Sequence, residues 1–288
     1  QEGIGHIPIT IDSKGTNVFN DLRLIKTLYQ IYKAEKFDLI FHFTIKILIY
    51  GSLICSIKKI KSIAFTTGLG IVFTKDNLRS KIVKMMYKTA LRGVCEVWFL
   101  NHDDWSLFVD GNIVPKEKTC IIPSEGVNSD YYCPMESSKK DGKFRFLLCS
   151  RLFGEKGVRE FVSAARDLKR KYPDMLFTLL GKCDKGTGSD ITAEEIDGWV
   201  NEGIIEHMGY AIEVRQFIAD SDCVVLPSYY REGVPRCLME AMSMEKPIVT
   251  TNNVGCVEVI EDGVNLYRRI LEDFALLGLG VPCVCAPF

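Results

Sequence analysis

The hydrophobic pattern is most regular in the second half of the chain, where short apolar runs alternate with stretches of helical spacing. The apolar run 144–150 is followed by 157–171, in which apolar residues recur at intervals of three and four. This alternation is typical of βαβ units and a parallel sheet. The expected strands are 144–150, 176–180, 204–208, 223–226 and 247–250, and the expected helices are 157–171, 192–201, 212–219 and 236–243.

In the first half of the chain, the alternation of apolar runs with helically spaced stretches is less regular. The pattern predicts helices over 22–33 and 81–94, strands over 38–42, 62–66, 97–100 and 120–123, and a strand-like stretch at 5–11. The polar run 137–143 interrupts it, so we expect a first domain at 1–140 and a second at 141–265. Residues 266–288 form an apolar tail rich in Cys, Gly and Pro, without helical periodicity. Two α/β domains facing each other would leave a ligand cleft between them.

Composition adds little to this picture. The net charge is −1, but residues 1–100 carry +8 and the remainder −9. One part of the molecule is therefore expected to face anions, although ordinary solvated helix faces explain the split equally well. The eleven cysteines contain no C-x-x-C and the four histidines form no cluster, so we expect free thiols in a reducing cytosol and no metal site. No signal peptide opens the chain, and no apolar run reaches the ~18 residues of a membrane span.

Two glutamates flank the place where a helix is expected to begin. Strand 223–226 runs into a polar turn that holds Glu232, Gly233, Val234 and Pro235, and Glu240 follows on the helix. Proline suits a first helical position, and glycine allows a ligand to approach the backbone. Helix starts bind anions, and the two carboxylates accept hydroxyl hydrogens. The pattern predicts a site for a sugar joined to a diphosphate. The alternative is a helix-face Glu240 and a Glu232 that merely complements the helix dipole.

Two basic residues follow the expected strand 144–150. Arg151 and Lys156 lie five residues apart, just before the expected helix 157–171. An arginine fork and a lysine ammonium can both neutralise a diphosphate. Taken alone they are more simply surface charges beside a loop; together with the two-glutamate turn they indicate an anion site.

The residues from about 10 to 265 resemble the retaining glycosyltransferases of family four, which have the GT-B fold of two Rossmann-like domains facing a cleft. The second half carries this resemblance in SRLFGEKGVREFVSAARDLK, FTLLG and LPSYYREGVPRCLMEAMSMEKPIVTTNNVGCVEVIEDGVN. The first half looks like the subgroup that acts on lipid-linked oligosaccharides, through FDLIFHFTIKILIYGS, TTGLG and VWFLNHDDWSLF. We expect both domains to be incomplete, because the family's opening strand and closing helices have no counterpart here.

The resemblance implies a role for each matching position of the donor site. Arg151 and Lys156 would neutralise the diphosphate of a UDP-sugar, and Glu240 would hold the ribose hydroxyls. Glu232 would hold the transferred sugar, with the N–H groups of Gly233 and Val234, and would be catalytic. Tyr210 would lie near the base. No metal or other cofactor is implied.

The acceptor side is expected in the first domain. His42 ends a strand and would reach the sugar or the acceptor hydroxyl as a second catalytic residue; the alternative is a buried, hydrogen-bonded histidine. Lys46, Gly68 and Gly70 would line the acceptor side, although Lys46 is nearly as well explained as a surface lysine. A basic helix could rest on anionic lipid or be an ordinary amphipathic surface helix; its cations are Arg79, Lys81, Lys84, Lys88 and Arg92.

The expected activity is transfer of a hexose or N-acetylhexosamine from a UDP-sugar to a lipid-linked saccharide, at the cytoplasmic face of the membrane. Two alternatives stay open: a nucleotide-sugar 2-epimerase of the same fold, and an inactive nucleotide-sugar-binding remnant. A dinucleotide oxidoreductase is disfavoured because no G-x-G-x-x-G follows a strand, and we expect no nucleic-acid partner.

Overall fold

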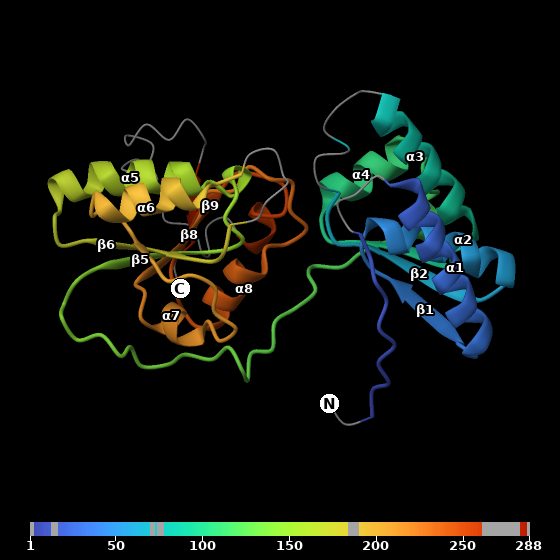
Figure 1. Cartoon of the computed structure of the whole chain (residues 1–288), viewed down its shortest axis with the longest axis horizontal. Coiled ribbons are helices and arrows are strands. Elements are labelled where there is room, and N and C mark those ends of the chain that lie inside the picture. Colours follow the sequence, from blue (N-terminus) through green and yellow to red (C-terminus); the bar gives the residue numbers. More distant parts are fainter. Residues whose placement is uncertain are drawn as a thin grey trace. The chain divides into compact units, whose positions relative to one another are not determined.

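The computed structural model describes residues 3–12, 17–69, 73, 78–183, 190–260 and 283–286. The chain divides into two compact units, Gln1–Ile122 and Pro123–Phe288. Both are α/β units in which helices pack on a largely parallel sheet (Figure 1). Short 3₁₀ helices in the described part of the chain span Leu91–Gly93, Lys116–Lys118, Gly154–Lys156 and Val257–Val259.

The first unit contains a four-stranded parallel sheet whose strands pair in sequence order. Its strands are β1 Leu39–His42, β2 Lys61–Thr66, β3 Glu96–Phe99 and β4 Thr119–Ile121. Its helices are α1 Val18–Ala34, α2 Ile45–Lys58, α3 Leu78–Ala90 and α4 His102–Asp110. Because parallel crossovers are right-handed, sequential strand order places α2, α3 and α4 on one face of the sheet.

Three elements of the first unit depart from the sequence expectation. Helix α4 was not predicted. Helix α2 was not predicted, because it is apolar on nearly all sides and shows no amphipathic period; it is buried at positions such as Leu48, Ile49 and Ile54. Residues 5–11 form no strand, and Pro8 in their middle has no N–H to donate to a ladder. The other expected elements are present, with ends shifted by a few residues.

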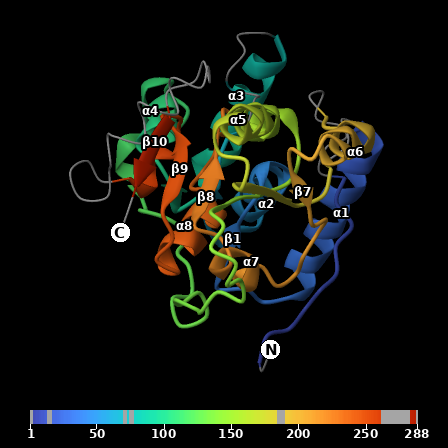
Figure 2. The ribbon, with the colours of Figure 1, turned by 90° about the vertical axis from the view of Figure 1, so that its left-hand side faces the viewer.

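The second unit contains a six-stranded sheet in the order β10-β9-β8-β5-β6-β7. Its strands are β5 Arg145–Cys149, β6 Leu176–Leu180, β7 Glu206–His207, β8 Cys223–Leu226, β9 Ile248–Thr251 and β10 Cys283–Ala286. All pairs are parallel except β9 with β10, which lie side by side in Figure 2. Of the expected tail 266–288, only 283–286 lies within the described residues.

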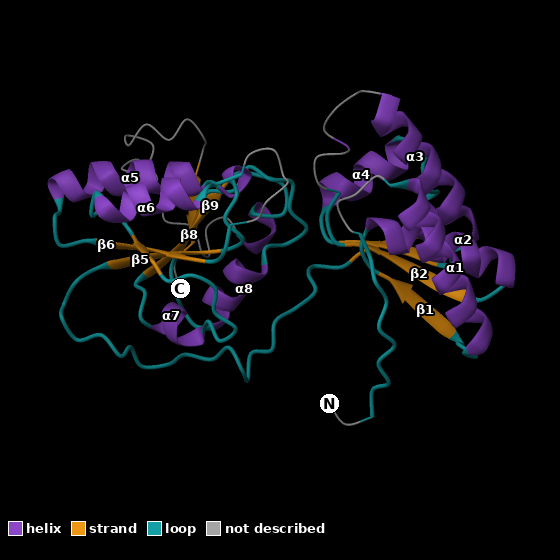
Figure 3. Ribbon diagram, in the orientation of Figure 1, coloured by secondary structure: helices purple, strands orange, loops and turns teal. Residues whose placement is uncertain are grey.

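Helices cover both faces of this second sheet (Figure 3). They are α5 Val158–Lys171, α6 Ala193–Asn201, α7 Arg215–Ala219 and α8 Arg236–Ser243. The first two pack on one face and the last two on the other, each over its own buried apolar cluster. The strand order reverses between β5 and β8, and ligands of open α/β sheets bind beyond the carboxyl ends of the strands at such a point.

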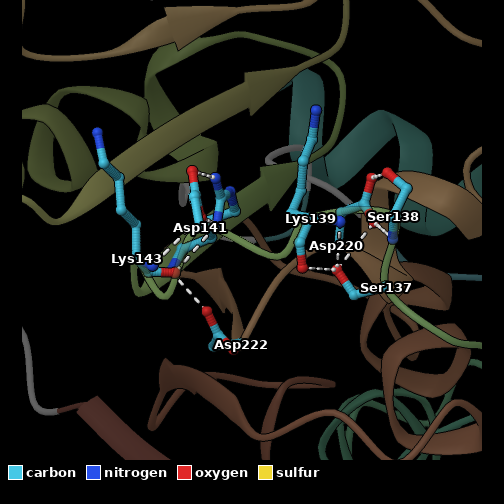
Figure 4. Close-up of polar contacts among 8 residues, drawn as sticks. Ser137, Ser138, Lys139, Asp141, Lys143, Asp220 and Asp222 are labelled. Atoms are coloured by element: carbon cyan, nitrogen blue, oxygen red, sulfur yellow. Dashed lines mark hydrogen bonds and ion pairs between the residues drawn. The ribbon is translucent and has the colours of Figure 1, made fainter.

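The boundary between the units follows Ile122, not residue 140 as the polar run suggested. Residues 123–143 belong to the second unit, and Asp220 at the end of α7 binds two of their serines. Asp220 accepts hydrogen bonds from Ser137 Oγ at 3.0 Å, from the Ser138 backbone N–H at 2.6 Å and from Ser138 Oγ at 2.8 Å (Figure 4). The polar run is therefore a docked segment, whose serines satisfy a carboxylate.

Candidate functional site

Two loops meet at the carboxyl edge of the second sheet. One leaves β5 and leads through the 3₁₀ turn Gly154–Lys156 to α5; the other leaves β8 and leads to α8. They are in close contact at Gly157, which has φ +76° and a hydrogen facing the Pro227 carbonyl oxygen. A Cβ there would overlap that oxygen, so only glycine allows this approach.

Lys156 and Glu232 come together across these loops as an ion pair between Nζ and Oε1. Both side chains are close to 90% buried, and Ser228 Oγ donates to the same Glu232 oxygen at 2.9 Å. Lys156 Nζ also lies 5.9 Å from the Phe153 ring centroid and 5.7 Å from that of Tyr230. The structure thus unites a predicted cation and a predicted carboxylate that are 76 residues apart in sequence.

The loop that carries Glu232 is fixed by hydrogen bonds on both sides. The backbone N–H groups of Tyr229 and Tyr230 donate to the Glu155 carbonyl at 2.9 and 3.0 Å. Asn253 Nδ2 donates to the Tyr230 carbonyl at 2.7 Å. Glu232 is therefore held in place by the scaffold, and Gly233 and Val234 are buried directly behind it.

Glu240 lies on α8 and is 8% exposed. The helix begins at Arg236 and Pro235 caps it, so this proline lies one position before the predicted one. Arg236 Nη2 is 3.2 Å from Glu240 Oε1. Burial raises the pKa of Glu240 above its usual value, and the Arg236 contact counteracts part of that rise.

Arg151 and Tyr210 line one cavity of about 170 Å³ beside the strand ends. Its walls are mainly apolar and include Leu180, Ala211 and Val214. Arg151 is exposed, with its guanidinium carbon 5.3 Å from the Phe153 ring centroid. Tyr210 is 67% exposed, and Lys182 Nζ lies 5.4 Å from its ring centroid.

Two thiols pack among the charged groups. Cys237 on α8 interacts electrostatically with Cys149 and with the charged groups of Lys156, Glu232 and Glu240. Burial raises the pKa of Cys149 to about 12 and that of Cys237 further, so both thiols remain protonated. They serve as packing groups here.

His42 does not reach a ligand site, contrary to the catalytic role expected for it. Strand alternation turns its side chain toward α2, where it is 0% exposed. Tyr32 Oη lies 3.1 Å from Nε2 and Ser52 Oγ 3.2 Å from Nδ1. Gly51 leaves the space that the imidazole occupies. His42 is thus a buried, hydrogen-bonded core residue.

The acceptor-side residues are only partly described. Lys46 lies in the first turn of α2 and forms a 2.7 Å ion pair with Asp21 of α1, whose other oxygen accepts from Tyr50 Oη at 3.0 Å. Gly68 has φ +123° in the turn after β2. Gly70 lies outside the described residues. Their role toward an acceptor stays a prediction.

Sequence reasoning missed Tyr132, whose backbone carbonyl accepts from Ser243 Oγ of α8 and which belongs to a segment without regular structure. It also missed a larger cavity of about 620 Å³ behind Val234, lined by α8 and by Pro123 to Val127. No motif marked either feature. Within the described part of the chain, no group of three or more His, Cys, Asp or Glu side chains could hold a metal ion.

Comparisons with family models and solved structures match this chain to glycosyltransferases. The family model described as "Glycosyl transferases group 1" matches residues 143–275, and the one described as "Glycosyl transferase 4-like" matches residues 1–101. The HepE protein of Anabaena, solved with UDP and glucose, superposes with a TM-score of 0.69 at 22% identity, over 84% of this chain and 66% of that one. A glycosyltransferase from Rickettsia africae superposes with a TM-score of 0.67 at 20% identity, over 89% and 69%. Both matching family models describe glycosyltransferases, and the chain has the GT-B type of fold.

Two curated relatives are similar over most of the chain. One is the N,N′-diacetylbacillosaminyl-diphospho-undecaprenol alpha-1,3-N-acetylgalactosaminyltransferase of Campylobacter jejuni, 29% identical over 69% of this chain and 54% of that protein. The other is the UDP-Gal:alpha-D-GlcNAc-diphosphoundecaprenol alpha-1,3-galactosyltransferase of Escherichia coli, 23% identical over 84% and 65%. The chain therefore spans between half and two thirds of the length of these relatives. Among the described helices, none is both long and apolar enough to cross a bilayer.

Proposed function

We propose that this chain carries the donor site of a retaining glycosyltransferase that moves a hexose or N-acetylhexosamine from a UDP-sugar to a lipid-linked saccharide. The observation that carries the proposal is the buried Lys156–Glu232 pair at the strand ends of the second unit, with Glu240 nearby. A cation for a diphosphate and carboxylates for sugar hydroxyls are the groups that a sugar nucleotide requires.

The donor fits this site in three parts. The cavity that Arg151 and Tyr210 line would take the uracil ring, which stacks well on an aromatic side chain. Glu240 would accept hydrogen bonds from the ribose hydroxyls, and Lys156 and Arg151 would face the diphosphate. Glu232 would hold the hydroxyls of the transferred sugar.

The chemistry follows from where charge develops. Transfer breaks the bond between the sugar C1 and the diphosphate oxygen and forms a bond from C1 to the acceptor oxygen, whose proton is released. The diphosphate takes the electron pair of the broken bond, so negative charge grows beside Lys156 and Arg151. Preorganised cations in a buried site stabilise such charge without reorganisation. The sugar passes through an oxocarbenium-like state, for which a neighbouring Glu232 carboxylate is favourable.

The acceptor class follows from the relatives. The names of both curated relatives specify undecaprenyl-diphosphate-linked saccharides, and one specifies UDP-Gal. This supports a lipid-linked acceptor and transfer rather than epimerisation.

The decisive assay incubates the chain with radiolabelled UDP-sugars, with and without an undecaprenyl-diphosphate disaccharide. The proposal expects label in the lipid fraction only when the acceptor is present. Epimerised donor without acceptor would indicate the 2-epimerase instead. Saturable UDP binding with no product would indicate the binding remnant.

We further propose that α3 contacts an anionic membrane surface at the cytoplasmic face. Leu78, Ile82 and Met85 are exposed on one side of this helix. Residues 78–92 contain no acidic residue, and their cations are Arg79, Lys81, Lys84, Lys88 and Arg92. Apolar groups flanked by cations are typical of helices that lie on anionic lipid.

Cosedimentation with vesicles tests this contact. Wild-type chain should pellet with phosphatidylglycerol vesicles and stay in solution with phosphatidylcholine alone. Replacing Lys81, Lys84 and Lys88 by Glu should abolish pelleting, whereas Lys169→Glu with Lys171→Glu in the second unit should not. Equal pelleting of the α3 variant would refute the contact.

A further inference from the structure

Lys156 and Glu232 form an ion pair in which one carboxylate oxygen meets two donors. Glu232 Oε1 contacts Lys156 Nζ and also accepts a hydrogen bond from Ser228 Oγ at 2.9 Å. The serine is 0% exposed, and its backbone carbonyl accepts from Asn253 Nδ2 at 3.3 Å. The Glu232 carboxylate is therefore held against the lysine by a hydroxyl group that the scaffold fixes.

The position of this pair makes Glu232 a competitor of any anion that Lys156 attracts. An anion in contact with Lys156 Nζ also approaches the Glu232 carboxylate, because the ammonium group touches both. The two side chains are close to 90% buried, and the ammonium lies 5.7 Å from the Tyr230 ring centroid, so water screens the repulsion between the two anions only weakly. Part of the attraction that Lys156 offers to a diphosphate is therefore cancelled by its own partner.

A sugar attached to the diphosphate changes this balance. Esterification of the terminal phosphate gives a UDP-sugar less negative charge than UDP, which lowers the repulsion from Glu232. The sugar also brings hydroxyls that can donate to the carboxylate, and hydrogen bonds to a charged group are among the stronger ones. A UDP-sugar therefore stabilises the Glu232 carboxylate, whereas UDP repels it.

We propose that Glu232 is a specificity-determining residue, which disfavours free UDP because its carboxylate competes for Lys156 and favours a UDP-sugar because it accepts the sugar hydroxyls. The inference rests on the roles proposed above for Lys156 and Glu232 in donor binding. It adds a consequence for the reaction sequence: after transfer, the same competition lowers the affinity for the UDP product and favours its release.

Calorimetry of Glu232→Gln tests the proposal, since the substitution removes the charge and keeps the shape. The ligands are UMP, UDP, and either UDP-galactose or UDP-N-acetylgalactosamine, whichever the wild-type chain binds more tightly. UDP binding should become about tenfold tighter and UDP-sugar binding about tenfold weaker, as expected when one contact with a charged group is lost in each case. UMP lacks the second phosphate, so its affinity should change less than that of UDP.

Glu202→Gln provides a matched control in the same unit. Glu202 Oε2 lies 2.7 Å from Arg166 Nη2, in an ion pair between α5 and the end of α6. The substitution removes the same charge from a paired carboxylate outside the proposed donor site. It should change none of the three affinities.

Opposite changes for UDP and the UDP-sugar distinguish this inference from a general loss of the site. A Glu232→Gln chain that binds both ligands more weakly, or both as wild type does, would overturn it. Should Glu232→Gln fail to fold, Glu232→Asp keeps the charge but shortens the side chain, and it should reduce the preference for the UDP-sugar over UDP; an unchanged preference would overturn the inference. A wild-type chain that binds neither UDP nor a UDP-sugar would instead overturn the proposed function.

Discussion

At the scale of single residues, the second unit holds charges that are buried but paired. Lys156 and Glu232 satisfy each other, and Ser228 adds a hydrogen bond. A buried ion pair of this kind contributes little net stability, yet breaking it by removing one partner is costly. This explains how the site can keep a cation ready for an anionic ligand without destabilising the fold.

Lys156→Met is therefore expected to act in two ways. It should lower the free energy of unfolding by about 3 kcal/mol, because Glu232 stays buried without its cation. It should also weaken UDP binding at least tenfold while affecting UMP less. Denaturant titration and calorimetry measure the two effects.

Pairing Lys156→Met with Glu232→Gln separates these effects. The double variant should regain part of the lost stability, since no charge is left unpaired, but it should not regain UDP affinity. Lys169→Met, on the solvated end of α5, serves as the comparison. Full recovery of UDP binding in the double variant would show that the lysine is only structural.

The burial of His42 should make the stability of the fold depend on pH. Burial lowers the pKa of His42 to about 4 in the folded chain, whereas an unfolded chain protonates this imidazole near 6.5. Above pH 6.5 the His42 imidazole is neutral in both the folded and the unfolded chain, so it adds no pH dependence to the free energy of unfolding. As pH falls from 6.5 to 4 the unfolded state binds the extra proton, so up to about 3 kcal/mol of stability is lost.

Denaturant titrations across this pH window measure the effect. His42→Gln should flatten the slope between pH 6.5 and 4, whereas His102→Gln changes an exposed imidazole and serves as the comparison. A wild-type chain with constant stability over the window would contradict the buried, neutral histidine.

At the scale of elements, the site depends on how closely the β5 and β8 loops approach. Gly157→Ala should destabilise the second unit by several kcal/mol and abolish UDP binding, because the added Cβ meets the Pro227 carbonyl oxygen at a positive φ. Gly198→Ala within α6, where the added methyl meets open space, should instead stabilise by about 0.5–1 kcal/mol. Thermal melts of both variants compare the two directly; a neutral Gly157→Ala would refute the close approach.

The same scale shows what the sequence could predict. Among the described residues of the second unit, the alternation of apolar runs with helically spaced stretches located every strand and α-helix except β10. Fully buried strands such as β8 stand out as short apolar runs, and amphipathic helices such as α5 show a helical period. The same patterns missed α2 and α4 of the first unit. Helix α2 is apolar on nearly all sides and therefore has no period to detect. The patterns placed His42 at a strand end correctly, but the side to which that residue points depends on the sheet's pleat and on the space that Gly51 leaves.

The candidate site was predictable where its residues are adjacent in sequence. Glu232 to Glu240 and Arg151 to Lys156 form short motifs, and the structure brings Lys156 and Glu232 into contact. The contact of Tyr132 with α8 was not predictable, because Ser243 lies 111 residues away in the sequence and the segment of Tyr132 has no periodicity. The domain boundary was misplaced for a related reason: the serines of the polar run 137–143 bind Asp220, which only the fold brings near.

At the scale of the whole molecule, the chain consists of two compact units, and the proposed donor site belongs to the second. Hydrogen exchange should therefore show UDP-dependent protection at β5, β8 and α8. Ligand at a hundredfold excess over its dissociation constant stabilises the state that binds it by about 2.7 kcal/mol. Protection confined to β1–β4 would show that the nucleotide binds the first unit, which would contradict the proposed site.

The central claim is that the second unit binds a uridine diphosphate donor through Lys156 and Glu240. Isothermal titration of UDP into the folded chain, beside the Glu240→Ala variant, tests it most directly. The account predicts saturable binding of one UDP per chain, weakened at least tenfold by the substitution. A folded chain that takes up no UDP at millimolar concentration, or a variant that binds UDP as tightly as wild type, would contradict it.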